Sequence, residues 1–557
     1  MNRPFASFVV ILSPFFSSSA LFTTFSPANE QDDYPAYFVF PGQMLETGSM
    51  GNNPFSDRRL TGALGGQSFL DTFVLSVLPY DYLNLSDRGV GWLILILVMW
   101  ELFRKFKSSR TMTALSTISI MLFYSAFGNI TGHVTATALL VFLGYLFFEE
   151  KLSKNSYLTQ ATLFAFLVAA LASIKSNIIV ACFFYLIFYF IISYKEAVGQ
   201  KEKLLVIKSL AVFVLLTFIF LFPWMVMLYQ SSGTLLYPIF GKGFHGSVYG
   251  TYDAPYSKWS FANFLTLFLN LANIIFLILF LLGIFIWKSK CTKIEVFTRL
   301  KSLILLTFLS IFSIAFLTAG LMVHYYTYPI VIASVIIMLA AFISESEALS
   351  GLFSSWRHDQ IAVVLLAVMF GSGVFYNTPS LKPNLKLIQM HLRDNQSVAF
   401  KEGKRVSGNF ASTPDERARY QNAQNTIPFE KKVLARTEKP FLFNLKQNNV
   451  YIIDLPGGAS LPPGMPSYKG GEALSKYLLS NDIQYIVYTY ATECSASETI
   501  YGGYATSTTN IWQNTAVKVT FDFNKNLKEL GYTKKRIFDD GNMFVLDLAQ
   551  PINKSKL

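Results

Sequence analysis

Long apolar runs recur along the chain and stop near residue 376. Most are about long enough to cross a bilayer as helices, and the charged residues collect between them. The pattern predicts about eleven spans. They lie at 5–25, 89–103, 111–128, 133–148, 159–174, 177–194, 205–229, 261–287, 301–320, 323–343 and 360–376. The pattern therefore indicates an α-helical polytopic membrane protein, with residues 1–376 as its transmembrane domain.

Beyond residue 376 the pattern changes to short alternating strand and helix signals. Strands are expected at 450–455, 484–490 and 541–549, and an amphipathic helix at 470–483. Such a β-α-β order predicts a small parallel or mixed sheet, so residues 377–557 form a C-terminal α/β domain. Its loop "LPGGASLPPGMP" has neither the Gly-Lys-Ser/Thr of a P-loop nor GxGxxG spacing, and it is better explained as a rigid turn.

Composition supports the membrane assignment. Hydrophobic residues make up 52% of the chain and charged residues 14%, whereas a soluble domain carries about 25% charged residues. The net charge of +12 is explained by basic residues in cytoplasmic loops rather than by nucleic-acid binding. The three cysteines lie far apart, so they indicate no disulfide framework or metal cluster.

The distribution of basic residues sets the expected orientation. With the N-terminus in the cytoplasm, seventeen Lys and Arg lie in inside segments and six in outside loops. The C-terminal domain is then extracytoplasmic, on a plasma or inner membrane. The first apolar run could also be a cleaved signal peptide, but a retained helix is favoured because the run is long.

Two outside loops are long and rich in ionisable residues. The first, 26–88, carries two stretches of helical length that would lie along the membrane surface, and the second is 230–260. Ionisable groups at membrane depth are costly, so they suggest a functional site. The candidates in these loops and at the outer ends of spans are Asp32, Asp33, Arg58, Arg59, Lys175, Lys242, His245 and His324.

Each candidate also has a structural explanation. The acid pair would be a solvated helix end, and the adjacent arginines would pair with lipid phosphates. Lys242 would be an ordinary loop lysine, and Lys175 would extend its amine to the interface. The combination of an acid pair with several cations on one face favours function.

The layout resembles the GT-C glycosyltransferases, which include lipid A aminoarabinose transferases, protein O-mannosyltransferases and oligosaccharyltransferases. The resemblance rests on "DDYPAYF" after the first helix, "NPFSDRRL" with "GGQSF" in the first loop, and "YPIFGKGFHG" in the second. It implies a sugar donor on a polyprenyl phosphate and an acidic residue as base, with Asp32 favoured over Asp33. The C-terminal domain resembles no family.

The implied chemistry is coherent with these residues. A base takes the proton from the acceptor, and fixed cations stabilise the phosphate as it leaves. The donor phosphate would be held by Arg58, Arg59, Lys242, His245, Lys175 and His324. The second carboxylate could raise its neighbour's pKa, orient the acceptor or bind a divalent metal. No cofactor is certain, and a glycan, a lipid and a protein all stay open as acceptors.

Two other functions were weighed. A transporter or flippase of lipid-linked sugars should carry internal repeats and broken helices, and the sequence shows no repeat. A non-catalytic membrane protein with a partner-binding outer domain would not need so polar a first loop. The enzyme hypothesis alone requires the acid pair and the cations to share one cavity.

Overall fold

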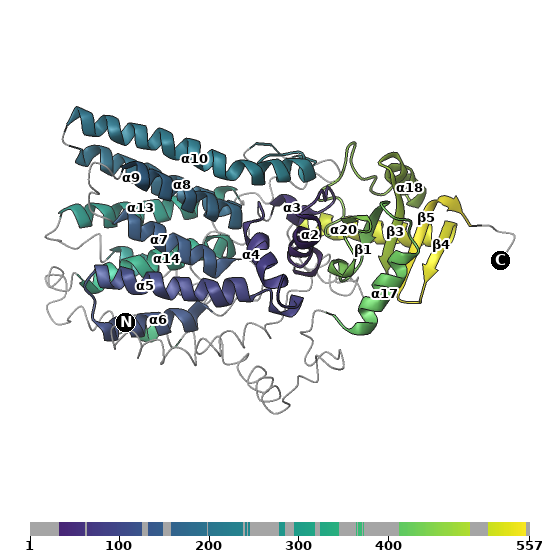
Figure 1. Cartoon of the computed structure of the whole chain (residues 1–557), viewed down its shortest axis with the longest axis horizontal. Coiled ribbons are helices and arrows are strands. Elements are labelled where there is room, and N and C mark those ends of the chain that lie inside the picture. Colours follow the sequence, from purple (N-terminus) through teal and green to yellow (C-terminus); the bar gives the residue numbers. More distant parts are fainter. Residues whose placement is uncertain are drawn as a thin grey trace, which may run out of the picture.

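The computed structural model describes residues 33–61, 64–124, 132–148, 157–197, 199–237, 240–241, 243–244, 278–284, 294–317, 323–344, 364, 366–369, 371, 412–490 and 511–552. A bundle of roughly parallel helices forms one end of the molecule and a sheet with its helices forms the other (Figure 1). Residues 33–91, called the junction segment below, lie between the two.

The helices of the bundle follow the apolar pattern of the sequence closely. They are α5 (Trp92–Lys105), α6 (Arg110–Tyr124), α7 (His133–Phe147), α8 (Tyr157–Ile174), α9 (Ile179–Glu196), α10 (Gln200–Ser232), α13 (Ile294–Leu317) and α14 (Val323–Ser344). Within the described residues, four helical segments are long and apolar enough to cross a membrane. The predicted total of about eleven is therefore not confirmed. The run 5–25 lies outside the described residues.

The helices differ in how far they are buried. The apolar window of α14 is 94% buried, so α14 is the central helix, whereas that of α10 is 22% buried. Leu215 and Phe218 of α10 are exposed, as expected for a helix that faces lipid. Against α14, α7 presents Gly144, where an added Cβ would lie 2.2 Å from Ile337 Cδ1. A small residue is thus required for the close approach of these two helices.

The junction segment is built from short helical pieces. They are η1 (Asp33–Tyr37), α2 (Val39–Thr47), α3 (Asp57–Thr61), α4 (Gly66–Leu75), η2 (Tyr80–Tyr82) and η3 (Leu85–Gly91). The α4 helix begins directly against the end of α8. Gly65 has a φ of +125°, and a Cβ on Gly66 would lie 2.2 Å from Ser173 Oγ, so the sequence "GG" is what allows this contact.

A five-stranded mixed sheet lies beyond the junction segment. Its elements are α17 (Pro414–Asn425), β1 (Lys432–Arg436), η6 (Pro440–Leu442), β2 (Asn449–Ile452), α18 (Gly471–Ser480), β3 (Ile483–Thr489), α20 (Ile511–Thr533), β4 (Lys534–Asp539) and β5 (Met543–Pro551). The strand order is β2-β1-β3-β5-β4. The first three strands are parallel, and β5 is antiparallel to β3 and β4. The three predicted strands correspond to β2, β3 and β5, whereas β1 and β4 were not predicted.

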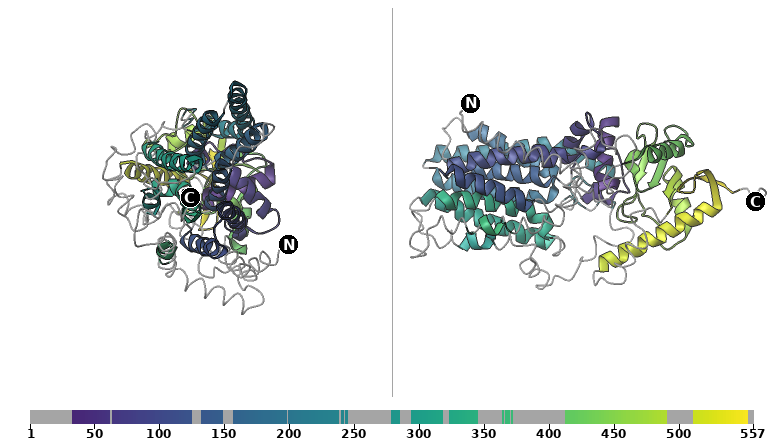
Figure 2. Two further views of the ribbon diagram at one scale, coloured as in Figure 1. Left: turned by 90° about the vertical axis from the view of Figure 1, so that its left-hand side faces the viewer. Right: turned by 90° about the horizontal axis from the view of Figure 1, so that it is seen from below.

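The two faces of the sheet are covered differently. Leu434 of β1 belongs to a hydrophobic cluster with α18 and α20, and α20 runs along one side of the sheet (Figure 2). Its neighbour Val433 points to the other face, as strand alternation requires, and packs in a cluster with the junction segment. There the ring centroids of Phe38 and Phe441 are 5.0 Å apart. The junction segment thus serves as part of the second covering layer of the sheet.

A single carboxylate fastens α3 to the sheet. Asp454, just after β2, accepts hydrogen bonds from Ser56 Oγ (2.7 Å) and from the backbone N–H groups of Asp57 (2.8 Å) and Arg58 (3.0 Å). Its side chain is fully buried. Because these donors are at the start of α3, the carboxylate caps that helix from a distant part of the chain.

We expect Asp454→Ala to lower the free energy of unfolding by about 1–3 kcal/mol, because buried donors lose their acceptor. The matched control is Glu472→Ala, which removes a carboxylate that is 61% exposed and pairs with Lys534. That change should cost only about 0–1 kcal/mol. Chemical denaturation of the detergent-solubilised protein measures both. Equal losses in the two variants would contradict the capping role.

Candidate functional site

Three buried carboxyl groups of the junction segment lie near one another. Asp33 opens η1, Asp71 lies on α4 and Asp87 lies on η3, and they are 0%, 1% and 3% exposed. Burial raises the pKa of Asp71 well above its usual value. Hydrogen bonds from Ser86 and Gln67 oppose this, and the negative charges of Asp87 and Asp33 raise the pKa further. This group of three buried carboxyl groups is called the acid cluster below.

Asp71 is oriented by two polar neighbours. Gln67, one turn earlier on α4, donates from Nε2 to Asp71 Oδ1 (2.8 Å) and to Ser86 Oγ (2.8 Å). The Ser86 hydroxyl also donates to Asp71 Oδ1. The three side chains therefore form a closed hydrogen-bonded set that fixes the carboxyl group of Asp71.

Asp87 joins the junction segment to the bundle. Its carboxylate accepts hydrogen bonds from the backbone N–H groups of Thr135 (2.7 Å) and Val134 (3.3 Å) at the start of α7. The amino end of a helix presents unpaired N–H groups and a partial positive charge, so a carboxylate is stabilised there. Asp87 thus acts as a cap supplied from outside the helix.

A buried pair of basic side chains adjoins the acid cluster. Lys175, between α8 and α9, places Nζ 2.8 Å from Nε2 of His133, the first residue of α7. Burial lowers the pKa of Lys175 to about 7, and the nearby charge of Asp87 acts in the opposite direction. The amine therefore changes its charge near neutral pH, which an ordinary lysine does not do.

The two adjacent arginines of α3 contact the sheet region. Besides the bond from its backbone N–H, Arg58 places Nη1 3.6 Å from Asp454 Oδ2. Arg59 is 0% exposed, and its backbone N–H donates to Ser56 Oγ (3.1 Å). Its Nε, Nη1 and Nη2 have no hydrogen-bond partner in the part of the chain that the structure describes. Burial lowers the pKa of Arg59 to about 10.

The predicted site residues are thus distributed over two places. Asp33 and Lys175 lie at the acid cluster, and Arg58 and Arg59 lie on α3. Three more, Asp32, Lys242 and His245, are outside the described residues, and for His324 of α14 the side chain is not described. Within the described residues, no group of three His, Cys, Asp or Glu side chains is placed to hold a metal ion.

Sequence reasoning missed Asp71, Asp87 and His133. A signal for Asp71 was available, because it is the one carboxyl group in the apolar helix "GQSFLDTFVL". Asp87 lies two residues before the expected span 89–103, and His133 is the first residue of the expected span 133–148, where a polar residue looks like an ordinary helix end. Their importance depends on contacts between distant segments, which spacing along the chain does not reveal.

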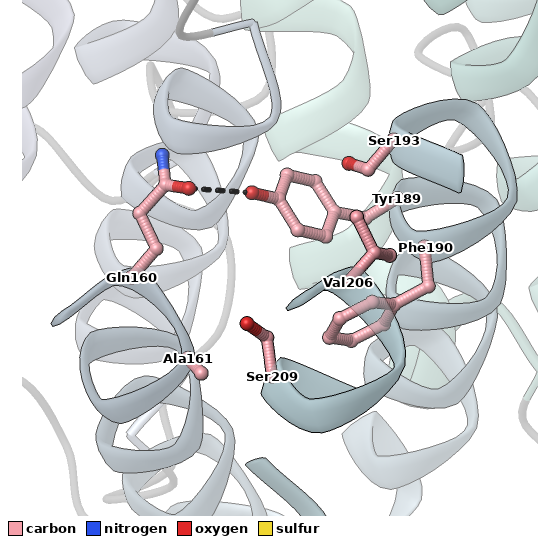
Figure 3. Close-up of a pocket in the computed structure, with 7 residues that line it drawn as sticks. All are labelled: Gln160, Ala161, Tyr189, Phe190, Ser193, Val206 and Ser209. Atoms are coloured by element: carbon pink, nitrogen blue, oxygen red, sulfur yellow. Dashed lines mark hydrogen bonds between the residues drawn. The ribbon is translucent and has the colours of Figure 1, made fainter. Parts of the chain in front are cut away.

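A small cavity elsewhere in the bundle is separate from this site. It lies between α8, α9 and α10 and is lined by Gln160, Ala161, Tyr189, Phe190, Ser193, Val206 and Ser209 (Figure 3). Tyr189 donates its hydroxyl hydrogen to Gln160 Oε1 (2.8 Å). Gln160 is near the start of α8 and Lys175 follows its end, so the cavity and the acid cluster are roughly 20 Å apart along this helix.

Comparison with known proteins gives matches to solved structures. No protein-family model matches the chain, and no curated protein matches it. ArnT from Cupriavidus metallidurans in the apo state has a TM-score of 0.48 and 12% identity over 98% of both chains. ArnT bound to undecaprenyl phosphate gives 0.48 and 11% over 98% of both chains.

A third match is the archaeal oligosaccharyltransferase AglB from Archaeoglobus fulgidus, in complex with an inhibitory peptide and a dolichol-phosphate. It has a TM-score of 0.45 and 9% identity over 94% of this chain and 72% of that chain. ArnT and AglB are GT-C superfamily membrane glycosyltransferases, the superfamily that the sequence layout resembles.

The pKa of Lys175 predicts a specific pH dependence of stability. Its value in the folded protein, about 7, lies below its ordinary value of 10.5, so the folded state resists protonation. The wild-type protein should therefore lose stability as pH falls from about 10 to 7, and level off below 7. Lys175→Met lacks this loss. The melting temperature of the variant minus that of wild type should therefore increase as pH falls from about 10 to 7.

Thermal unfolding in detergent between pH 6 and pH 10 measures the difference. Lys201→Met, which replaces an exposed lysine of α10, is the matched control and should give a difference that does not vary with pH. A pH-independent difference for Lys175→Met would show that the buried amine keeps an ordinary affinity for its proton.

Proposed function

We propose that this chain is a membrane glycosyltransferase that moves a sugar from a polyprenyl-phosphate-linked donor to an acceptor. The observation that carries the proposal is the acid cluster beside Lys175 and His133. Buried ionisable groups that lie close together are typical of catalytic sites, and they are costly where they serve no function. The charge distribution of the sequence favours a reaction at the extracytoplasmic face, with the C-terminal domain on the same side.

The proposed reaction is a direct displacement. A carboxylate takes the proton from an acceptor O–H or N–H, and the acceptor atom forms a bond to the anomeric carbon of the sugar. The bond from that carbon to the phosphate oxygen breaks, and its electron pair leaves with the lipid phosphate. Because a phosphate is a stable anion, this step requires a base and a cation but no general acid.

Asp71 and the candidate bases have different roles in this proposal. Asp32 and Asp33 are the candidate bases, and the sequence resemblance favours Asp32. Since Asp71 keeps its proton to higher pH than an ordinary carboxyl group, it gives Asp33 a neutral neighbour in place of another negative charge. A protonated Asp71 can therefore serve as a hydrogen-bond donor beside a carboxylate base.

The leaving phosphate requires a nearby positive charge. Lys175 is the described candidate at the acid cluster, where its buried ammonium form would gain stability from an arriving phosphate. The other candidates for holding the donor are Arg58, Arg59, Lys242, His245 and His324. Donor binding should consequently raise the pKa of Lys175.

We expect Asp33→Asn and Asp32→Asn to preserve donor binding, and at least one of them to lower the transfer rate by about 10²–10⁴. Asn keeps the size of the side chain but cannot accept the proton. The assay uses labelled polyprenyl-phosphate sugars with a mixed acceptor preparation. Asp482→Asn, at an exposed carboxylate, is the control and should leave the rate unchanged. Wild-type rates in both test variants would exclude the acid pair as the base.

A further inference from the structure

The parallel part of the sheet has a topological switch point between β1 and β3. The chain leaves β1 toward β2 on one side, and it leaves β3 toward β4 and β5 on the other. In open sheets, ligands bind beyond the carboxyl ends of the strands at such a point. Arg436 is the last residue of β1, so its side chain belongs to this edge of the sheet.

The guanidinium group of Arg436 is fixed at one nitrogen and unpaired at the other two. It is 5% exposed. Nη1 donates to the carbonyl oxygens of Ile453 (3.1 Å) and Asp454 (2.9 Å). Nε and Nη2 are buried and have no hydrogen-bond partner in the described part of the chain. These two nitrogens form the fork that binds a carboxylate or phosphate through two parallel hydrogen bonds.

Other buried donors without a partner belong to residues around the carboxyl ends of β1 and β2. Asn53 of the junction segment accepts from the backbone N–H of Ile452 at Oδ1 (3.1 Å), whereas its buried Nδ2 has no partner among the described residues. The buried hydroxyl of Thr437, the residue after Arg436, also has no hydrogen-bond partner among the described residues.

The carboxylate in this region does not satisfy these donors. Asp454 is already engaged by Ser56, by the N–H groups of Asp57 and Arg58, and by the N–H of Leu455 (2.6 Å). Buried donors without acceptors are rare in folded proteins, and each calls for an explanation. In this region the buried groups without a partner are donors, except for one hydroxyl that can also accept. A matching ligand is therefore rich in acceptor oxygens.

We propose that the carboxyl end of β1, together with the junction segment, forms an oxyanion site in which Arg436 binds a phosphate or carboxylate group through its Nε–Nη2 fork. Asn53 and Thr437 supply further donors at this edge of the sheet. The site lies between the sheet and α3 and contains none of the acid cluster. It does not depend on the proposed sugar transfer.

The first test measures the melting temperature of the full chain in detergent during titration with inorganic phosphate. A ligand that binds only the folded state raises it in a saturable way. We expect this rise in wild type and in the matched control Arg419→Lys, which changes a partly exposed arginine of α17. Arg436→Lys keeps the charge but loses the fork, so its apparent phosphate affinity should fall about tenfold or more.

Sodium chloride at equal ionic strength separates specific binding from screening, because chloride cannot bridge the fork. The proposal is overturned if Arg436→Lys responds to phosphate as wild type does, or if chloride reproduces the wild-type rise. Asn53→Asp provides a second variant should Arg436→Lys fail to fold. It keeps the acceptor for Ile452 but adds a negative charge, so the phosphate response should disappear; an unchanged response would contradict the site.

The same measurement in lipid nanodiscs identifies the source of the oxyanion. One arm uses neutral lipid with free phosphate, and the other uses neutral lipid containing undecaprenyl phosphate without free phosphate. If stabilisation depends on Arg436 in the first arm, the site binds a soluble anion. If it depends on Arg436 in the second arm, the site binds a lipid phosphate. Stabilisation in neither arm excludes the site.

Discussion

The contact of Asp87 with the amino end of α7 is the interaction on which the candidate site depends. Because Asp87 holds the N–H groups of Val134 and Thr135, the position of η3 is fixed relative to the bundle. His133 is the preceding residue, so the same contact determines where Lys175 meets the junction segment. Without this cap, the buried carboxylate of Asp87 would lose two hydrogen-bond donors, and η3 would lose these polar contacts with α7.

The junction segment contacts both halves of the molecule with different chemistry. Toward the bundle it presents carboxyl groups, which meet a helix terminus and a buried lysine. Toward the sheet it presents aromatic rings, N–H groups and the buried side chain of Asn53. Both the acid cluster and the proposed oxyanion site therefore lie at boundaries of one segment, although no residue is shared between them.

The sequence predicted the helices well because a membrane span must be apolar over its whole length. This signal placed both ends of α8 and of α14 within two residues of their positions in the structure. It missed β1 and β4, whose short sequences "KVLAR" and "KKRIFD" carry charges that hide the strand pattern. In the site, Asp33 and Lys175 were predictable because charges beside apolar runs stand out. The bond from Arg58 to Asp454 spans 396 residues, and no local pattern predicts such a contact.

The hydrophobic cluster shared by the junction segment and the sheet has a consequence for synthesis. The backbone N–H of Leu445 donates to Glu46, 399 residues earlier in the chain. Near this bond, the rings of Phe38 and Phe441 meet edge to face. At about 5–20 residues per second, a ribosome needs roughly 20–80 s to make the intervening chain. Throughout that interval the aromatic face of the junction segment has no sheet to cover it. The nascent protein therefore passes through a stage in which this apolar surface requires a chaperone or the membrane surface as a temporary cover.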